Sequence, residues 1–321
     1  MIGGSRFVGR LVVWRLLARG DRVTILNRGV TPDPFGDRVE RLRGDRTKGD
    51  LERLVRGRSF DVAFDFTAYV EGDVEEAVRS LRVGHYIFIS TGQVYLVREG
   101  CPRPSREEDY DGSLVARPED PEELGQWEYG AGKRACEDAL VRARSFPSTR
   151  LRIPVVNGEG DPSGRLDGYL WRLQDGGPVI LPDGGTHRVR HVYGLDVARA
   201  LVALAGDART HGKAYNLAND ETPALLELVA LLARELGAPA RTVALPSSAL
   251  LARGLAPRRI SAFSSPWQSF LVPARARSEL GFVPTPLDFQ ARSIVASFLA
   301  HAPRAPEEYA LDRPRELELA P

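Results

Sequence analysis

The sequence predicts an α/β fold, in which helices cover both faces of a parallel β-sheet and a smaller, less regular C-terminal lobe follows. Three observations support this prediction. A glycine-rich turn occupies residues 3–9, short β-branched segments alternate with helical ones up to about residue 155, and this alternation loosens beyond that point. Such alternation is typical of a doubly wound sheet, because each helix returns the chain to the start of the next parallel strand.

The individual elements follow from local composition. Apolar side chains behind the glycine turn recur with helical spacing, so we expect a helix there. Runs rich in aliphatic and β-branched residues predict strands, and apolar residues spaced between polar ones predict helices. The expected strands are 22–26, 62–66, 86–89 and 149–153, with one more before Asp45, and the expected helices are 51–55, 74–81 and 129–143. The polar, acidic stretch 98–126 is interpreted as a long loop near the site.

The chain beyond residue 155 predicts a second lobe. Helical patterns cover 195–205 and 225–236, with a strand at 214–217 between them. The proline- and charge-rich end is expected to be a loosely held tail. We therefore expect a dinucleotide-binding domain at 1–155, a mainly substrate-binding lobe at 156–302 with some segments returning to the first domain, and a tail at 303–321.

One expected element is unusually short. The first strand of a doubly wound sheet precedes its glycine turn by about five residues. Here only Met1 and Ile2 precede Gly3. Because that strand is central, its loss should expose the interior of the sheet. Two interpretations stay open: the protein starts upstream, or the chain is an incomplete version of a working fold.

Composition narrows the possible functions. The 321 residues include 44 basic and 43 acidic ones, and this near balance argues against a nucleic-acid partner. The two cysteines fit a reducing compartment rather than a disulfide scaffold. We see neither an apolar run of 18 residues nor a signal peptide, so we expect a cytoplasmic protein without a membrane partner. His187 and His191 lack companions at ligand spacing, so no metal is expected.

The glycine turn predicts a nucleotide cofactor. Glycines allow backbone N–H groups at a helix N-terminus to approach a pyrophosphate closely. The next strand ends in Asn27 and Arg28, where an acidic residue would hold the ribose hydroxyls of NAD. This pair instead suits a 2′-phosphate and favours NADP, with NAD as the alternative. Arg6 is either a second cation near that phosphate or a solvated surface residue.

Two further segments extend the expected cofactor site. Asp45 either accepts a hydrogen bond from the adenine amino group or satisfies N–H groups of its own loop. Thr67, Ala68 and Tyr69 follow a strand at the carboxyl edge of the sheet, where the binding crevice forms. We therefore expect these three residues to pass close to the cofactor ribose.

Tyr129 and Lys133 predict the chemistry. Positions four apart lie on one face of a helix, so the phenol and the ammonium point into the same space. An ammonium stabilises the phenolate and makes the phenol a usable acid and base near neutral pH. The spacing alone is weak evidence. After a glycine turn and a strand ending in Ser90 and Thr91, it indicates an acid/base pair.

As a set, these motifs resemble the extended short-chain dehydrogenase/reductase superfamily, of the NAD(P)-dependent epimerase/dehydratase type. The resemblance covers the chain to about residue 300, and the glycine turn is similar to that of an atypical branch that includes chloroplast stem-loop-binding proteins. It is carried by the glycine turn, the Tyr-x-x-x-Lys motif and the segments 89–95, 151–161, 188–198 and 214–217.

The resemblance implies a Rossmann fold and a role for each site residue. Tyr129 would be the general acid/base, Lys133 would bind the nicotinamide ribose, and Thr91 would orient the reacting oxygen. Arg188 and Arg190 would bind a substrate pyrophosphate, unless they form a surface pair. The expected cofactor residues are Gly3, Ser5, Arg6, Phe7, Val8, Asn27, Arg28, Asp45, Thr67, Ala68, Tyr69, Ser90, Tyr129, Lys133, Pro154 and Val155, and the expected substrate residues are Gln93, Asn157, Arg188 and Arg190.

One departure from the family narrows the reaction. Sugar-nucleotide dehydratases of this superfamily carry an acidic pair directly after the serine or threonine, where this chain has Gly92 and Gln93. An amide cannot act as a general acid at neutral pH, so dehydration is disfavoured.

We therefore expect an NAD(P)-dependent epimerase or reductase that transfers hydride at a carbinol or carbonyl carbon of a nucleotide sugar or related small molecule. The alternatives are an NADPH-dependent reductase of a non-sugar carbonyl compound and an RNA-binding relative of the stem-loop-binding proteins. The resemblance also allows a homodimer through the helices after Val74 and at Tyr129.

Overall fold

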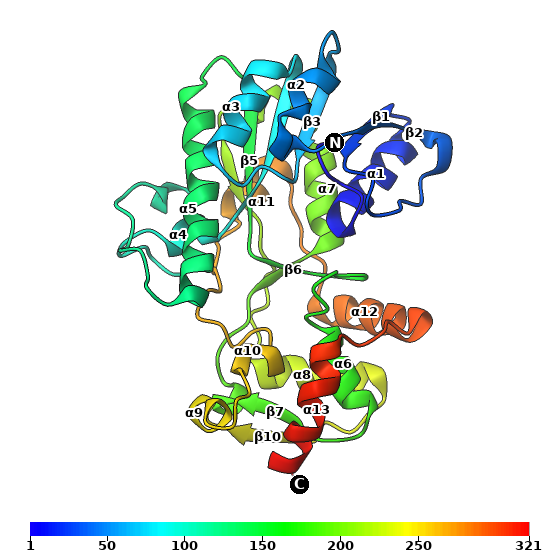
Figure 1. Cartoon of the computed structure of the whole chain (residues 1–321), viewed down its shortest axis with the longest axis vertical. Helices are drawn as coiled ribbons and strands as arrows, with labels where there is room; N and C mark the ends of the chain where they lie inside the picture. The colour runs from blue at the N-terminus through cyan, green and yellow to red at the C-terminus, as the bar shows by residue number, and fades with distance from the viewer. Residues whose placement is uncertain (321) are drawn as a thin grey trace. The chain divides into compact units, whose positions relative to one another are not determined.

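A computed structural model describes residues 1–320 of the chain, which divides into two compact units (Figure 1). Unit 1 contains Met1–Pro154, Gly194–Ala218 and Ser269–Val283. Unit 2 contains Val155–Tyr193, Asn219–Gln268 and the chain from Pro284 onward. None of the helices in residues 1–320 combines the length and the apolar character that a membrane span requires.

Unit 1 is built on a parallel sheet, which confirms the predicted α/β class. The pairing order is β3-β4-β5-β9, and β1 pairs with β2. Its strands are β1 (Val23–Asn27), β2 (Val39–Arg43), β3 (Phe60–Asp65), β4 (Val83–Thr91), β5 (Ser148–Ile153) and β9 (Ala214–Asn216). Its helices are α1 (Phe7–Arg19), α2 (Asp50–Val55), α3 (Glu71–Ser80), α4 (Gln93–Leu96), α5 (Pro121–Arg142), α7 (Gly194–Leu204) and α11 (Ala274–Leu280). Its short 3₁₀ turns are η1 (Gly36–Arg38), η2 (Arg46–Lys48), η3 (Glu107–Tyr110) and η5 (Ala208–Thr210).

Ile2 joins the two parts of this sheet. It forms parallel bridges to Leu26 of β1 and to Asp65 of β3. Its N–H donates to the carbonyl of Phe64 at 2.8 Å, and its carbonyl accepts from the N–H of Phe66 at 3.0 Å. The residues before the glycine turn therefore supply the carboxyl end of the central strand. The part of the strand that positions the turn is in place.

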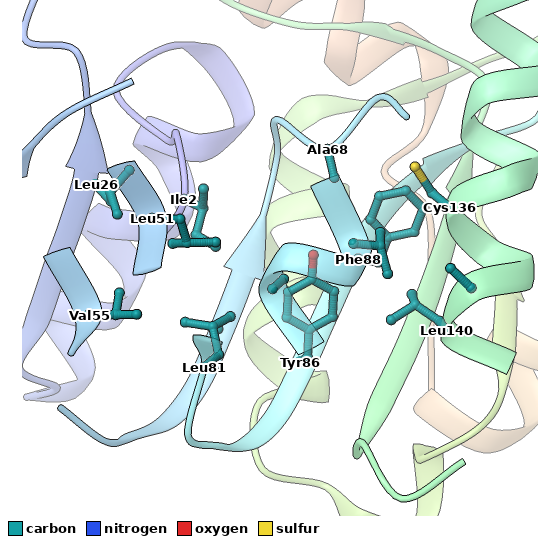
Figure 2. Packing of buried hydrophobic residues seen from close by; sticks show 14 residues of the cluster. Ile2, Leu26, Leu51, Val55, Ala68, Leu81, Tyr86, Phe88, Cys136 and Leu140 are labelled. Atoms are coloured by element: carbon teal, nitrogen blue, oxygen red, sulfur yellow. The ribbon is translucent and has the colours of Figure 1, made fainter. Parts of the chain in front are cut away.

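Helices cover both faces of the unit 1 sheet (Figure 1). α1 packs against α7, while α2, α3 and α5 form the layer on the opposite face. Figure 2 shows this second layer, where Leu51 and Val55 of α2 and Cys136 and Leu140 of α5 belong to the same buried cluster as Phe88 of β4. Each large apolar side chain buried in this way stabilises the fold by roughly 1.5–3 kcal/mol.

The helix that carries Tyr129 begins earlier than predicted. α5 starts at Pro121, so the expected loop 98–126 is shorter at its C-terminal end. The Asp120 carboxylate accepts from the N–H groups of Glu122 and Glu123, both at 3.0 Å. Aspartate at the N-cap and proline at the first helical position are both favourable helix starts. The Asp-Pro helix start was present in the sequence, but the polar composition of the first two turns favoured a loop.

Unit 2 contains two short parallel sheets and six helices among its described residues. The pairs are β6 with β8 and β7 with β10. The strands are β6 (Val155–Asn157), β7 (Val179–Pro182), β8 (His191–Tyr193) and β10 (Thr242–Leu245). The helices are α6 (Asp167–Gln174), α8 (Leu225–Leu236), α9 (Ser247–Leu251), α10 (Pro257–Ile260), α12 (Leu287–His301) and α13 (Glu307–Leu319), with one 3₁₀ turn, η4 (Asp183–Gly185).

The loosely held tail expected from residue 303 is instead helix α13, and that expectation was wrong. Glu316 on this helix forms a buried ion pair with Arg172 of α6, in which Nε donates to Oε2 at 2.8 Å. Arg313 donates to the Asp175 carboxylate at 2.7 Å. Composition alone suggested disorder because these charges find their partners about 140 residues away in the sequence.

Candidate active site

A cleft of about 560 Å³ opens at the carboxyl edge of the unit 1 sheet. It is lined by the glycine turn, the end of β1 and the loop after it, the loop after β2, and residues that follow β3. The crevice outside the carboxyl ends of parallel strands is the usual ligand site of a doubly wound sheet. Most of the cofactor residues predicted from these segments therefore come together in one cleft: Gly3, Ser5, Arg6, Asn27, Arg28, Asp45, Thr67 and Tyr69. Phe7, Val8 and Ala68 are not among its lining residues.

The glycine turn forms a close-fitting cradle. Gly3 and Gly4 adopt φ values of +81° and +95°, which side chains disfavour. A Cβ on Gly9 would lie 2.3 Å from the Cα of Gly4, so only glycine fits there. No side chain caps the N-terminus of α1, and its first turn carries no acidic residue. Its N–H groups are thus suited to an anion, and the residues present fit a dinucleotide pyrophosphate.

The Asn27 amide is committed to internal hydrogen bonds at the end of β1. Its Nδ2 donates to the hydroxyl of Ser5 at 3.0 Å, and its Oδ1 accepts from the N–H of Gly29 at 3.0 Å and from the Arg43 guanidinium. Asn27 therefore shapes the loop that carries Arg28.

The adenosine end of the cleft is rich in guanidinium groups. Arg6, Arg28 and Arg46 line it, whereas Asp45 is its one acidic lining residue. Arg6 donates through Nε at 2.9 Å and Nη2 at 2.6 Å to the hydroxyl of Thr31, which also lines the cleft. Arg6 is therefore held beside the cleft by a neutral partner.

Asp45 satisfies its own loop, which is the second of the two expected alternatives. Its Oδ1 accepts from the N–H and the hydroxyl of Thr47, at 3.0 and 2.8 Å. These hydrogen bonds hold the pKa of Asp45 below its ordinary value. Asp45 is nevertheless one of the residues that line the cleft.

Asp65 organises the loop after β3, and the sequence analysis missed it. Its buried carboxylate accepts from the Arg46 guanidinium at 2.7 Å, from the N–H groups of Thr67 and Ala68 at 2.8 and 3.0 Å, and from the Tyr86 hydroxyl at 2.6 Å. Burial, reinforced by this carboxylate, raises the pKa of Tyr86. An aspartate inside an apolar strand was the available signal, because such a group needs buried partners.

Tyr129 and Lys133 lie one turn apart on α5 in contrasting environments. Tyr129 is 38% exposed, whereas Lys133 is only 2% exposed. The Lys133 ammonium donates to the carbonyl of Ile89 at 2.8 Å and lies 4.7 Å from the centroids of the Tyr69 and Phe88 rings. Burial lowers the pKa of Lys133 to about 8, against the attraction of nearby carboxylates.

The two hydroxyl residues at the end of β4 have different surroundings. The Thr91 hydroxyl accepts from the N–H of Gln93 at 3.3 Å. The Ser90 hydroxyl donates to the buried carboxylate of Glu137 at 2.5 Å. The hydroxyl proton of Ser90, expected at the cofactor, is therefore engaged in the protein interior.

Glu137 belongs to a buried polar network that the sequence did not reveal. Arg152 of β5 donates to its carboxylate through Nη2 at 2.6 Å and to the Tyr95 hydroxyl through Nη1 at 2.6 Å. Tyr95 in turn donates to Oδ1 of Asn216 at 2.9 Å. This network ties α5 to β4 and β5 and, through Tyr95 of α4, to β9.

The expected substrate residues are divided between the units. Gln93 lies in unit 1, where its Nε2 donates to Oε1 of Gln126 at 2.5 Å. Asn157, Arg188 and Arg190 lie in unit 2. Arg188 donates to the carbonyl of Thr222 at 3.0 Å and has a side chain that is 63% exposed, whereas Arg190 is half-buried.

The unit boundary also falls between two of the expected cofactor residues. Pro154 ends unit 1, and Val155 begins unit 2 as the first residue of β6. In unit 2, the Asn157 side chain is fully buried, and neither of its amide atoms has a hydrogen-bond partner within residues 1–320. No group of three or more His, Cys, Asp or Glu side chains in that described part of the chain is arranged to hold a metal ion.

The doubly wound sheet, the glycine cradle and the Tyr-x-x-x-Lys pair together define an enzyme of the NAD(P)-dependent short-chain dehydrogenase/reductase type. Residues 1–218 match the NAD dependent epimerase/dehydratase family. The chain belongs to this family, as the sequence motifs predicted.

A curated plant protein is similar to part of this chain. The chloroplast stem-loop binding protein of 41 kDa b from Arabidopsis thaliana is 23% identical over 236 residues, which is 69% of this chain. The matched region spans 58% of the length of that curated relative.

Solved structures show the same fold. UDP-glucose 4-epimerase from Thermotoga maritima, solved with UDP-glucose, has a TM-score of 0.72 and 18% identity, covering 94% of this chain and 98% of that one. UDP-glucuronic acid 4-epimerase from Bacillus cereus, solved with UDP-glucuronic acid and NAD, has a TM-score of 0.69 and 18% identity, covering 93% and 98%.

Proposed function

We propose that the protein is an NADP(H)-dependent epimerase or reductase that transfers hydride at a carbinol or carbonyl carbon, with Tyr129 as the acid/base. One observation carries the proposal: Tyr69 lines the nucleotide cleft, and its ring contacts both Lys133 and Tyr129. These ring contacts support an acid/base role for Tyr129 and Lys133 next to a cleft that suits a dinucleotide.

The chain's own residues would hold the cofactor along this cleft. The N–H groups at the start of α1 and the hydroxyl of Ser5 would bind the pyrophosphate. Arg28, together with Arg6, would pair with a 2′-phosphate, because β1 ends in Asn27 rather than in a carboxylate. When bound, the nicotinamide supplies or accepts the hydride.

The remaining roles fall to side chains of β4 and α5. The Tyr129 hydroxyl would give its proton to the carbonyl oxygen during reduction, and the phenolate would take the carbinol proton during oxidation. The Lys133 ammonium would stabilise the phenolate. The Thr91 hydroxyl would orient the reacting oxygen at the end of β4.

The structure supports the absence of dehydratase chemistry. A Cβ on Gly92 would lie 2.2 Å from the hydroxyl oxygen of Ser269, so an acidic side chain does not fit there without rearrangement. Gln93 supplies only an amide at the next position. Hydride transfer needs no acid other than Tyr129, whether the enzyme only oxidises, only reduces, or does both in succession.

A nucleotide sugar is the substrate class we propose. The solved relatives with the same fold were obtained with UDP-glucose and with UDP-glucuronic acid. In unit 2, the buried amide of Asn157 has no hydrogen-bond partner among the described residues, so it is a candidate for binding such a ligand, with Arg190 as a second candidate from its sequence motif. A non-sugar carbonyl compound reduced by NADPH is the alternative.

Mass spectrometry of nucleotides released from the purified protein tests the proposal. A tightly bound NADP(H) that survives purification would favour an epimerase, in which the cofactor is regenerated in place. Turnover that depends on added NADPH would favour the reductase. If neither NADP(H) nor NAD(H) binds at micromolar concentration, as measured by calorimetry, the proposal is wrong.

RNA binding is a second candidate because the Arabidopsis relative is named for stem-loop binding. The formal charge of +1 weighs against it, since phosphate contacts require a basic surface. Complexes held by phosphate contacts weaken steeply between about 50 and 200 mM salt. Retention of a stem-loop RNA that falls steeply over this range would support RNA binding.

A further inference from the structure

Tyr69 lies where the nucleotide cleft meets the catalytic pair. It lines the cleft, its ring centroid is 6.3 Å from that of Tyr129, and its ring lies 4.7 Å from Nζ of Lys133. Tyr69 is 50% exposed, whereas Lys133 is almost completely buried. The Tyr69 ring is therefore part of the layer that separates the lysine ammonium from water.

A second ring completes the surroundings of the ammonium. Phe88 of β4 is fully buried, and its ring centroid also lies 4.7 Å from Nζ of Lys133. The remaining contact is the hydrogen bond to the carbonyl of Ile89. Two aromatic faces and one carbonyl oxygen thus fix the position of the ammonium.

The backbone places Tyr69 against the helix that carries the lysine. The N–H of Tyr69 donates to the Asp73 carboxylate at 2.7 Å. A Cβ on Gly132, the neighbour of Lys133, would lie 2.4 Å from the carbonyl oxygen of Tyr69. Because Gly132 has no side chain, the loop that carries Tyr69 packs directly against α5 next to Lys133.

We propose that Tyr69 is a positioning residue for Lys133, whose ring, together with that of Phe88, clamps the ammonium beside Tyr129 and keeps water away from it. The inference rests on the proposed function, because it explains how the lysine is held for the acid/base step. It assigns Tyr69 a role toward the lysine in addition to its expected contact with the cofactor.

Replacing the ring has two opposing effects on the lysine. The other groups that act on Lys133 stay in place: Asp65 from β3, Arg46 from η2, and Cys136 and Glu137 from α5 itself. Loss of the cation–π contact disfavours the charged form, whereas hydration favours it. Hydration should dominate, because burial is the largest influence on this lysine.

The lysine content of the chain allows a direct test. Lys48, Lys133 and Lys213 are its three lysines, against more than ten times as many arginines. Competitive acetylation over a pH series, followed by peptide mass spectrometry, gives a titration midpoint for each lysine. We expect the Lys133 midpoint near pH 8 in the parent and roughly one pH unit higher in Tyr69→Leu.

The controls separate positioning from general damage. Tyr69→Phe keeps the ring and should return the Lys133 midpoint to that of the parent. Lys213, which pairs with Glu279 at 2.7 Å, provides the internal reference: its extent of acetylation at a given pH should be the same in all variants. If Tyr69→Leu does not fold, Tyr69→Gln gives the same readout at this half-exposed position. A Lys133 midpoint that stays unchanged or falls, or a Tyr69→Phe shift as large as that of Tyr69→Leu, would overturn the inference.

The two proposals fail independently. The acetylation experiment needs neither cofactor nor substrate, so a shifted midpoint supports the role of Tyr69 even if no nucleotide binds. Conversely, cofactor-dependent turnover with an unshifted midpoint would leave the enzyme assignment intact and remove the role of Tyr69.

Discussion

The carboxylate of Glu137 and the guanidinium of Arg152 form a two-point ion pair, with contacts of 2.6 Å to Oε2 and 3.0 Å to Oε1, in the interior of unit 1. Both side chains are at most 2% exposed. Burial opposes the charge on the carboxylate, but Arg152 nevertheless holds the pKa of Glu137 below its ordinary value. The pair joins α5, which carries the Tyr-x-x-x-Lys motif, to β5 of the central sheet.

Breaking this pair should destabilise the protein strongly. Glu137→Gln removes the charge that balances Arg152, and an uncompensated buried charge costs about 3–5 kcal/mol. Urea unfolding followed by circular dichroism measures the loss. The matched control is Glu128→Gln, which breaks the exposed pair with Arg117 and should cost less than about 1 kcal/mol. Similar losses for both variants would contradict the structural role of the buried pair.

Tyr129→Phe should abolish most turnover while the affinity for the cofactor changes little. The variant loses the proton-transferring hydroxyl but keeps the ring, and general acid/base catalysis is worth roughly 10²–10⁴-fold. Stopped-flow or steady-state assays give the rate, and calorimetry gives the cofactor affinity. Near-normal turnover in this variant would show that another group moves the proton.

Arg28→Asp should reverse the cofactor preference. The substitution removes a cation at the adenosine end and installs the carboxylate that suits unmodified ribose hydroxyls. We expect NADP(H) to bind at least tenfold more weakly, about 1.4 kcal/mol, and NAD(H) to bind as well or better. The measurement is the ratio of the two dissociation constants, and an unaltered ratio would refute the NADP assignment.

Two glycines of α5 should respond in opposite directions to alanine. Gly132→Ala places a Cβ 2.4 Å from the Tyr69 carbonyl oxygen, so we expect about 1–3 kcal/mol of destabilisation from overpacking. Gly125→Ala has nothing within 4 Å and should stabilise the same helix by about 0.5–1 kcal/mol. Urea midpoints that move together in both variants would argue against the close approach of the loop to the helix.

His191 should make folding sensitive to acid. Burial lowers its pKa to about 4, against 6.5 for a free imidazole. Between these values the unfolded state binds more protons than the folded one, so stability is present above pH 6.5 and is lost as the pH falls. The loss should reach about 2 kcal/mol at pH 5.

The comparison of the parent with His191→Gln isolates this contribution. Unfolding free energies measured from pH 7.5 to 4.5 should fall less steeply in the variant than in the parent. Parallel curves would mean that His191 is not buried in its neutral form.

Local sequence patterns predicted the elements that depend on short-range signals. Helix α8 has the predicted bounds, because leucines recur with helical spacing and Gly237 ends the helix in a left-handed conformation. The glycine turn and the Tyr129–Lys133 spacing were equally local. Their placement next to one cleft followed from the order of parallel strands.

The groups that hold the site together could not be predicted in this way. Two buried ion pairs, Asp65 with Arg46 and Glu137 with Arg152, each join separate elements. The local sequence around one residue of a pair does not indicate which residue is its partner. The same reason hid helix α13, which is fixed by ion pairs to distant residues. The spacing of apolar residues indicates which face of a helix or strand is buried, but it does not indicate which buried charges form an ion pair.

The bridging position of Ile2 has a consequence for cofactor binding. Its parallel bridges reach β1 on one side and β3 on the other, and the residues that follow both strands line the nucleotide cleft. A dinucleotide in this cleft would contact the ends of both strands at once. Amide hydrogen exchange in β1 and β3 should therefore slow together when the cofactor is added.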